Sequence, residues 1–230
     1  MKHLLGWCVL LACMASPLCA AAPERESFVA MCLRAGGFFG WCILACSVIG
    51  LGLLLEHAFS ISRRRLLRAE DAAALRALVL AGDTDQARAF CASNKGLIPA
   101  AMGAALARSK QGRESMERAA SERLEEDSVR LHSRIGWVAL LANLSPLLGL
   151  LGTVSGMLWS FGVIESMTNP APADLAGGIK EALVTTLLGL CVAIPLTIGF
   201  FFFRDRIVMM GLDANTAVSA LIDDICAETE

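Results

Sequence analysis

Three long apolar segments limit what this chain can fold into: residues 28–59, 135–164 and 179–203. An α-helix rises 1.5 Å per residue, so each segment has about the 20 residues or more that are needed to cross a membrane. The composition agrees, because 56% of the residues are hydrophobic and 18% are charged, whereas about a quarter are charged in soluble domains. We predict an all-α integral membrane protein with three transmembrane helices.

The first 21 residues have the layout of a secretory signal peptide. A lysine at position 2 precedes an apolar stretch, which ends in small residues followed by Pro23. We predict cleavage after Ala20 or Ala21, because cleavage after Ala22 would leave the proline beside the scissile bond. The alternative, an uncleaved extra membrane helix, is disfavoured because the apolar run is shorter than a span of about 20 residues.

The positions of the arginines predict the orientation of the chain. Four arginines follow the first apolar segment within residues 60–68, and Arg204 and Arg206 follow the third. The stretch from Glu165 to Asp174, in the loop predicted at 165–178, contains no lysine or arginine. Since positive residues stay on the cytoplasmic side, we predict a periplasmic N-terminus, a periplasmic loop, and a cytoplasmic tail over residues 204–230.

Residues 60–134 have a soluble, helical composition and are predicted to form a cytoplasmic region that extends the membrane bundle. Glycine, asparagine and proline break this region, so we expect helices at about 66–81, 84–93, 97–109 and 113–134. Asp83 is the predicted N-cap of the second helix. No breaker separates residue 134 from the second apolar segment, so the last helix should continue into the membrane as one rod.

The sequence disfavours an enzyme and a metal protein. It contains no recognisable catalytic triad, P-loop or dinucleotide-binding motif. The nine cysteines show no obvious pairing. Cys42 and Cys46 lie one helical turn apart, but no histidine or acidic co-ligand accompanies them, and small buried residues of this kind are usually structural. We therefore predict no enzyme activity, no metal site and no cofactor.

The second apolar segment combines small residues with a hydroxyl. Gly152 and Gly156 form a small-xxx-small pair, extended by Gly149, that permits close approach of another helix. Thr153 lies in the same stretch and could line a polar seam. Alternatively the glycines form only a packing face, and the threonine hydroxyl bonds to its own backbone. Pro146 begins this stretch.

The third apolar segment contains an acid. Glu181 and Thr185 are four residues apart and share one helical face, whereas Thr186 is somewhat rotated from them. A carboxylate within a membrane helix costs about 2.5–3.5 kcal/mol on insertion scales, and such residues usually face a protein interior or a water path. The alternative is that Glu181 reaches the outer interface. Pro195 should kink this helix or loosen its hydrogen bonding.

Two stretches resemble the signature of the MotA/TolQ/ExbB proton channel family. They are residues 145–154 (SPLLGLLGTV) and 178–190 (GIKEALVTTLLGL), with Ala193-Ile194-Pro195 after the second. The resemblance implies that Thr153 and Thr186 match the family's polar pore threonines and that Glu181 matches its membrane glutamate. Further pore or packing positions are Thr185, Gly152, Gly156, Pro146 and Pro195.

The resemblance also implies a role and partners. In this family five copies of such a subunit surround two copies of a single-span partner of the ExbD or TolR type, whose membrane aspartate carries the proton. The motor lies in the bacterial inner membrane and passes work to a TonB-like protein or to a Tol-type envelope system. We expect an ExbB-like energiser of TonB-dependent transport. The alternatives are a TolQ-like subunit for envelope maintenance and a non-conducting membrane scaffold.

Overall fold

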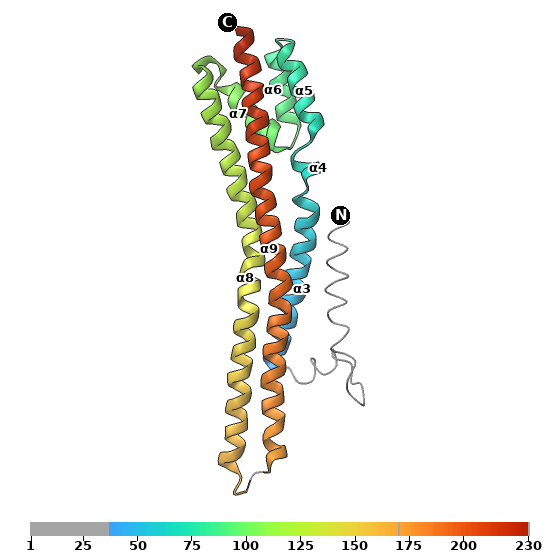
Figure 1. Ribbon diagram of the computed structural model, residues 1–230, viewed down its shortest axis with the longest axis vertical. Helices are drawn as coiled ribbons and strands as arrows, with labels where there is room; N and C mark the ends of the chain where they lie inside the picture. Colours follow the sequence, from blue (N-terminus) through green and yellow to red (C-terminus); the bar gives the residue numbers. More distant parts are fainter. Residues whose placement is uncertain (1–36, 170, 230) are drawn as a thin grey trace. The chain divides into compact units, whose positions relative to one another are not determined.

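The structure of the chain, a computed structural model, describes residues 37–169 and 171–229, and it is helical without strands over these ranges (Figure 1). The predicted signal peptide at 1–21 and the first residues of the segment at 28–59 lie outside the described residues. The described elements, in chain order, are α3 (Gly37–Ser60), α4 (Arg63–Leu66), α5 (Ala69–Leu80), α6 (Thr84–Ser93), α7 (Leu97–Ala107), a 3₁₀ turn (Ser109–Gln111), α8 (Arg113–Ser166) and α9 (Pro172–Thr229).

Three of these helices are long and apolar enough to cross a membrane. They are α3, α8, and α9 over Leu175–Ala227. The predicted rod is confirmed, because α8 runs for 54 residues without a break from the polar region into the second apolar segment. The long helices contribute to two compact units, and each unit is described separately below. Unit 1 contains residues 37–46 and 145–192, and unit 2 contains residues 47–144 and 193–229.

The short helices lie close to their predicted positions. Asp83 is the N-cap of α6, and its carboxylate accepts a hydrogen bond of 3.0 Å from the backbone N–H of Gln86. Gly82 and Gly112 precede α6 and α8 with φ angles of 69° and 89°, which are strained for residues with a Cβ. The helix expected from residue 66 begins instead at Ala69, because Leu67 is not helical and ends the separate turn α4.

Helix α9 extends further at both ends than the apolar segment at 179–203. The sequence predicts a loop over residues 165–178, but α8 continues to Ser166 and α9 begins at Pro172. Proline is favoured in the first turn of a helix, where its missing N–H has no helical acceptor, so the helix begins before the apolar segment does. The segment after residue 203, predicted only as a tail, continues the same helix to Thr229.

Unit 2 has a hydrophobic core of the soluble type, built around α7. This helix is apolar over almost its whole surface, and it buries residues that include Leu97, Met102 and Leu106. With 11 residues it is too short to span a membrane, and a short helix that is apolar all round is a core helix. Around it pack residues from α5 and α6, the first turns of α8, and the last turns of α9. Burial raises the pKa of the Cys91 thiol in α6 to about 11.

Ion pairs join the last part of α9 to other helices of unit 2. Arg63 and Arg113 form ion pairs of 2.6 Å with Asp213 and Asp223, and Arg76 lies 2.9 Å from Asp224. Exposed pairs of this kind contribute little to stability, so the buried apolar face of α9, which includes Ile207, Ala214 and Ile222, holds this helix in unit 2.

Helices α3 and α9 approach closely in unit 2 through two glycines. A Cβ on Gly50 would lie 2.7 Å from Cδ2 of Leu196, and a Cβ on Gly199 would lie 2.5 Å from Cδ2 of Leu54. A leucine side chain of the other helix therefore packs directly against each glycine. Because residue numbers increase together along the two helices, α3 and α9 run parallel.

Candidate functional site

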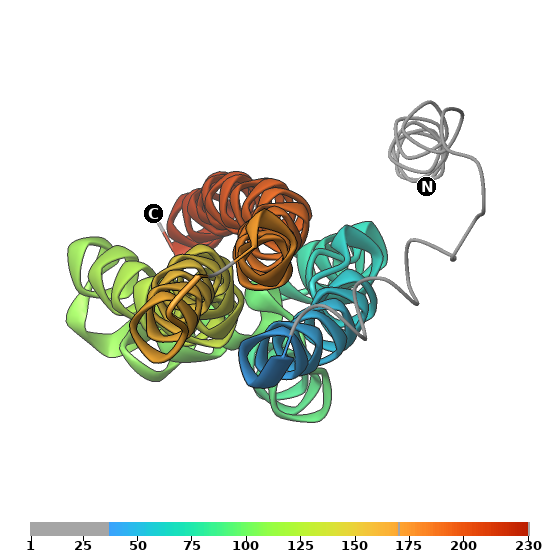
Figure 2. The ribbon, with the colours of Figure 1, turned by 90° about the horizontal axis from the view of Figure 1, so that it is seen from below.

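Unit 1 is built on a close antiparallel contact between α8 and α9, which lie side by side in Figures 1 and 2. Small residues at spacings of three and four line the facing sides of both helices, which is the spacing that keeps residues on one helical face. On α8 they are Ser145, Gly149, Gly152, Gly156 and Ser160, and on α9 they are Gly178, Ala182, Thr185 and Gly189. We call this contact the seam.

The glycines of the seam allow backbone to approach backbone. A Cβ on Gly189 would lie 2.6 Å from the carbonyl oxygen of Ser145, and a Cβ on Gly156 would lie 2.8 Å from that of Gly178. A Cβ on Gly152 would lie 2.6 Å from Oγ1 of Thr185. Contacts under 3 Å are closer than carbon atoms tolerate, so only glycine fits these positions at this helix separation.

Two of the threonines singled out in the sequence meet at the seam. The hydroxyls of Thr153 and Thr186 form a short hydrogen bond with each other. The same hydroxyls lie 2.9 Å and 3.2 Å from the carbonyl oxygen of Gly149. Both also lie 3.4–3.5 Å from the carbonyl oxygen of Ala182. A hydroxyl has one proton to donate, so one threonine donates to the other, and the second donates to one of these two carbonyls. Both side chains remain partly exposed, so this hydroxyl pair can also contact a group outside the chain.

Thr185 has a different environment from its neighbour Thr186. Its side chain is fully buried, with 1% of its surface exposed, and it packs against Gly152. Its hydroxyl lies 2.9 Å from the carbonyl oxygen of Ala182 and can donate to it, so a backbone acceptor within one turn satisfies it. Thr185 therefore stabilises the seam, and of the two threonines only Thr186 presents its hydroxyl to Thr153.

Glu181 lies against the beginning of α3. Its carboxylate occupies the space that a Cβ on Gly37 would need, and Gly37 has a φ angle of 48°. Gly37 is the first residue of α3, and the N-terminus of a helix favours negative charge because its first N–H groups lack helical acceptors. Among the described residues, the carboxylate forms no hydrogen bond or ion pair. The partly buried acid thus lies at the N-terminal end of α3.

Sequence reasoning missed Gly37 as a partner of the acid. The signal that could have found it is the pair Gly36-Gly37 directly before an apolar run, since paired glycines before a helix allow close approach of another group. Pro146 and Pro195 lie inside α8 and α9, and both helices continue through them. Each proline leaves the carbonyl four residues earlier without its helical donor.

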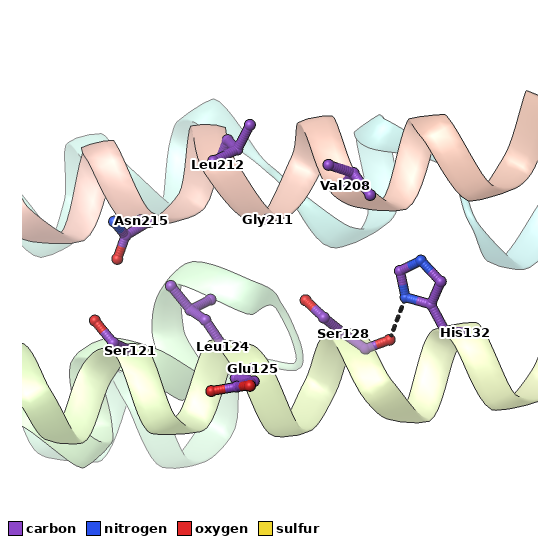
Figure 3. A pocket seen from close by; sticks show the side chains of 9 residues that line it. All are labelled: Ser121, Leu124, Glu125, Ser128, His132, Val208, Gly211, Leu212 and Asn215. Carbon is purple, nitrogen blue, oxygen red and sulfur yellow. Dashed lines mark hydrogen bonds between the residues drawn. The ribbon is translucent and has the colours of Figure 1, made fainter.

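A groove lies between α8 and α9 in unit 2, with a cavity volume of about 340 Å³. Figure 3 shows Ser121, Glu125, Ser128 and His132 on one wall, and Val208, Gly211, Leu212 and Asn215 on the other. Nδ1 of His132 donates to the carbonyl oxygen of Ser128 at 2.9 Å, since a carbonyl can only accept. Leu124 also lines the α8 wall, so the groove is mostly polar on the α8 side and mainly apolar on the α9 side.

The described part of the chain contains no group of three histidine, cysteine or acidic side chains placed to hold a metal ion. Its cysteines, Cys42, Cys46, Cys91, Cys191 and Cys226, are all free.

Comparison with known proteins agrees with the resemblance seen in the sequence. The model of the MotA/TolQ/ExbB proton channel family matches residues 92–212, which contain α7, α8 and the seam. The biopolymer transport protein exbB1 of Vibrio cholerae is 29% identical over 170 residues, which cover 71% of this chain and 73% of that protein.

Other relatives match over a shorter range. The Tol-Pal system protein TolQ of Pseudomonas aeruginosa is 33% identical over 97 residues, or 42% of each chain. The biopolymer transport protein ExbB of Xanthomonas campestris is 35% identical over 102 residues, which are 44% of this chain and 39% of that protein. The chain thus spans less than half the length of these two relatives, so similarity to them covers a segment rather than the whole protein.

The close approach at Gly152 can be tested by adding one methyl group. Gly152→Ala should lower the stability of the protein by about 1–3 kcal/mol, because an overpacked contact forces the helices apart. The matched control is Gly162→Ala on the same helix, where an added Cβ would meet nothing within 4 Å. Thermal unfolding in detergent compares the two variants, and equal melting temperatures would contradict the described helix separation.

Proposed function

Because this chain belongs to the MotA/TolQ/ExbB proton channel family, we propose that it is an ExbB-like subunit of a proton-driven motor in the bacterial inner membrane. The observation that carries the proposal is the hydroxyl pair of Thr153 and Thr186. Both hydroxyls lie within apolar helices, at the seam, and both keep part of their surface exposed. A hydroxyl can accept a proton and donate another, so such a pair can orient water or relay a proton.

The proton carrier itself comes from a partner. The second and third apolar segments contain no aspartate, and the acid that is present, Glu181, lies at the beginning of α3. We propose an ExbD- or TolR-like partner with a single span and a membrane aspartate, which passes the exposed threonine pair. Thr185, which is fully buried, would not meet this partner. Glu181 would set the charge along the path without carrying the proton.

The energy available suits mechanical work. A proton that moves down 100 mV releases about 2.3 kcal/mol, which is enough to bias a conformational step of the partner helices. The motor would pass this work to a TonB-like protein for transport across the outer membrane. The arginines after α3 and at the end of the third apolar segment favour a periplasmic N-terminus and a cytoplasmic C-terminus. In this orientation α4–α7 would be cytoplasmic.

Assembly as a homopentamer is part of the proposal. The groove of unit 2 is lined on α9 by Val208 and Leu212, whose side chains are 47% and 58% exposed. The nearby Met209 is 61% exposed. Large apolar side chains gathered on one exposed face are typical of an interface with another protein. Because these residues lie beyond the third apolar segment, lipid acyl chains would not cover them, and we propose that neighbouring copies do.

The same observations permit a Tol-type role. Relatives named TolQ and ExbB match this chain at 33% and 35% identity, over 97 and 102 residues. The longest of the three matches compared above is to exbB1, and this favours the ExbB-like role. The other alternative, a non-conducting scaffold, gives no reason for a partly exposed hydroxyl pair inside apolar helices.

Proton flux into proteoliposomes that hold this protein and its single-span partner tests the proposal. Thr153→Val and Thr186→Val should each reduce the partner-dependent flux by about a hundredfold or more, because a positioned proton-transfer group typically contributes about 10²–10⁴-fold. Glu181→Gln should reduce it as well. Thr153→Ser should retain flux, because it keeps the hydroxyl.

The matched control for these variants is Thr197→Val. Thr197 lies on the same helix α9, is exposed, and lies 2.8 Å from the carbonyl oxygen of Ala193, to which it can donate. Its variant should conduct like the wild type. Flux that is indifferent to all the substitutions at equal assembly would support the scaffold instead.

The oligomeric state can be tested at the groove. Leu212→Glu should dissociate the pentamer, because it places a charge in an interface that excludes water. Leu80→Glu is the control, since Leu80 is similarly exposed, at 54%, but lies on α5. Native mass spectrometry measures the assembly, and a pentamer that survives Leu212→Glu would show that copies do not meet at this groove.

Complementation distinguishes the two roles within the family. In a bacterium that lacks its own ExbB, this protein expressed with its partner should restore TonB-dependent uptake of iron chelates. In a bacterium that lacks TolQ, the protein should not restore the outer-membrane barrier, so the cells should remain sensitive to detergent. The reverse pattern would assign the protein to a Tol-type system.

A further inference from the structure

Most arginines with described side chains in unit 2 have partners. Hydrogen bonds or ion pairs engage Arg63, Arg76, Arg88, Arg108, Arg113, Arg118, Arg123 and Arg130. Five others have neither in the part of the chain that the structure describes. These five, which we call the boundary arginines, are Arg65, Arg68, Arg134, Arg204 and Arg206.

The boundary arginines lie where apolar sequence changes to polar sequence. The contacts of His57 show that this change from apolar to polar sequence lies at the same level in the three long helices of unit 2. The buried imidazole of His57 on α3 donates from Nε2 to the carbonyl oxygen of Arg134 on α8, at 3.2 Å. The ring of Phe203, which precedes Arg204 on α9, meets the same imidazole edge-on at 6.4 Å. Arg134 and Arg204 therefore lie at one level along the helices.

Exposed aromatic residues lie close to this level: Trp137 and Phe201 on its apolar side, and Phe59 two residues beyond His57 on its polar side. Trp137 follows Arg134 by less than one turn and is 63% exposed, and Phe59 is 76% exposed. Phe201, which is 49% exposed, has the guanidinium of Arg204 over its ring at 6.0 Å. A belt of exposed aromatic side chains beside cationic ones is typical of the level of the lipid headgroups.

The carboxylates close to the boundary arginines in the sequence do not neutralise them through ion pairs. Glu56 and Asp205 are exposed and form no ion pair with the described arginines. A guanidinium without a hydrogen bond or ion pair to the protein offers a fork of N–H donors that matches the oxygens of a phosphate. The negative surface of the cytoplasmic leaflet attracts such basic residues.

We propose that the boundary arginines bind the phosphate groups of anionic phospholipids in the cytoplasmic leaflet, with Arg134 and Arg204 at the centre of the site. The site would hold α3, α8 and α9 at a set depth in the bilayer, at the level of the His57 contact. This inference rests on the membrane orientation given in the proposed function, and its test uses the chain without a partner and without a proton gradient.

The test measures which lipids the protein retains. The full chain is reconstituted into vesicles of equal parts phosphatidylglycerol and phosphatidylcholine and extracted in a mild detergent, and native mass spectrometry then counts the bound lipids. The wild type should retain more phosphatidylglycerol than phosphatidylcholine. The double variant Arg134→Gln, Arg204→Gln should lose this preference by about fivefold for each arginine.

The control removes the same charge from paired arginines. Arg118 and Arg130 also lie on α8, with ion pairs of 3.1 Å to Glu122 and 2.5 Å to Glu126. The double variant Arg118→Gln, Arg130→Gln should keep the wild-type lipid preference. An equal loss in both double variants would overturn the site in favour of a general effect of charge.

Two further outcomes would also overturn the proposal. One is an unchanged lipid preference in the variant of Arg134 and Arg204. The other is a variant that keeps its lipids but loses its oligomeric state, which would assign these arginines to a neighbouring copy. None of these results depends on whether the protein conducts protons, so the lipid site and the proposed function succeed or fail separately.

Discussion

The close approach of α8 to α9 is the contact on which the candidate site depends. Inside a membrane the hydrophobic effect does not drive helices together, so close packing and hydrogen bonds must hold them. The glycines of the seam permit this packing, since a Cβ at Gly152 would already lie 2.6 Å from Thr185. Only at this separation do the hydroxyls of Thr153 and Thr186 reach each other. The packing that stabilises the pair of helices therefore also creates the polar group within it.

Each polar side chain in these apolar helices is accommodated differently, and the difference separates structural from functional roles. Thr185 is fully buried and bonds to its own helix, so it adds packing without leaving a group for a partner. The hydroxyls of Thr153 and Thr186 bond to each other and both lie within reach of the carbonyl oxygens of Gly149 and Ala182, and both side chains remain partly exposed. Glu181 lies at the first residue of α3, where the helix end favours an anion. The groups that remain accessible are those proposed to meet the proton-carrying partner.

Unit 2 is stabilised by a different balance of forces. Its core around α7 buries apolar side chains from five helices, as a soluble domain does, and exposed ion pairs between α9 and other helices lie at its edge. The hydrogen bond between His57 and Arg134 joins α3 to α8. Some of the paired arginines meet carboxylates of another helix and others meet groups close to them in the chain, whereas the boundary arginines have no such partner among the described residues.

Much of the secondary structure was determined by the sequence itself. The breaks at Gly82 and Gly112, the cap at Asp83, and the unbroken rod of α8 depend on residues within a few positions of one another, and the structure has them where the pattern predicts. The sequence also identified Thr153 and Thr186, through resemblance to a family. Only the tertiary structure decided that Thr186 meets Thr153 while Thr185 fills the seam. Adjacent residues on a helix differ by 100° in direction, and the rotation of α9 about its axis is set by contacts with residues far away in the chain. Gly37 lies 144 positions before Glu181 in the sequence. Their contact likewise depends on how distant helices pack, so the sequence alone does not predict it.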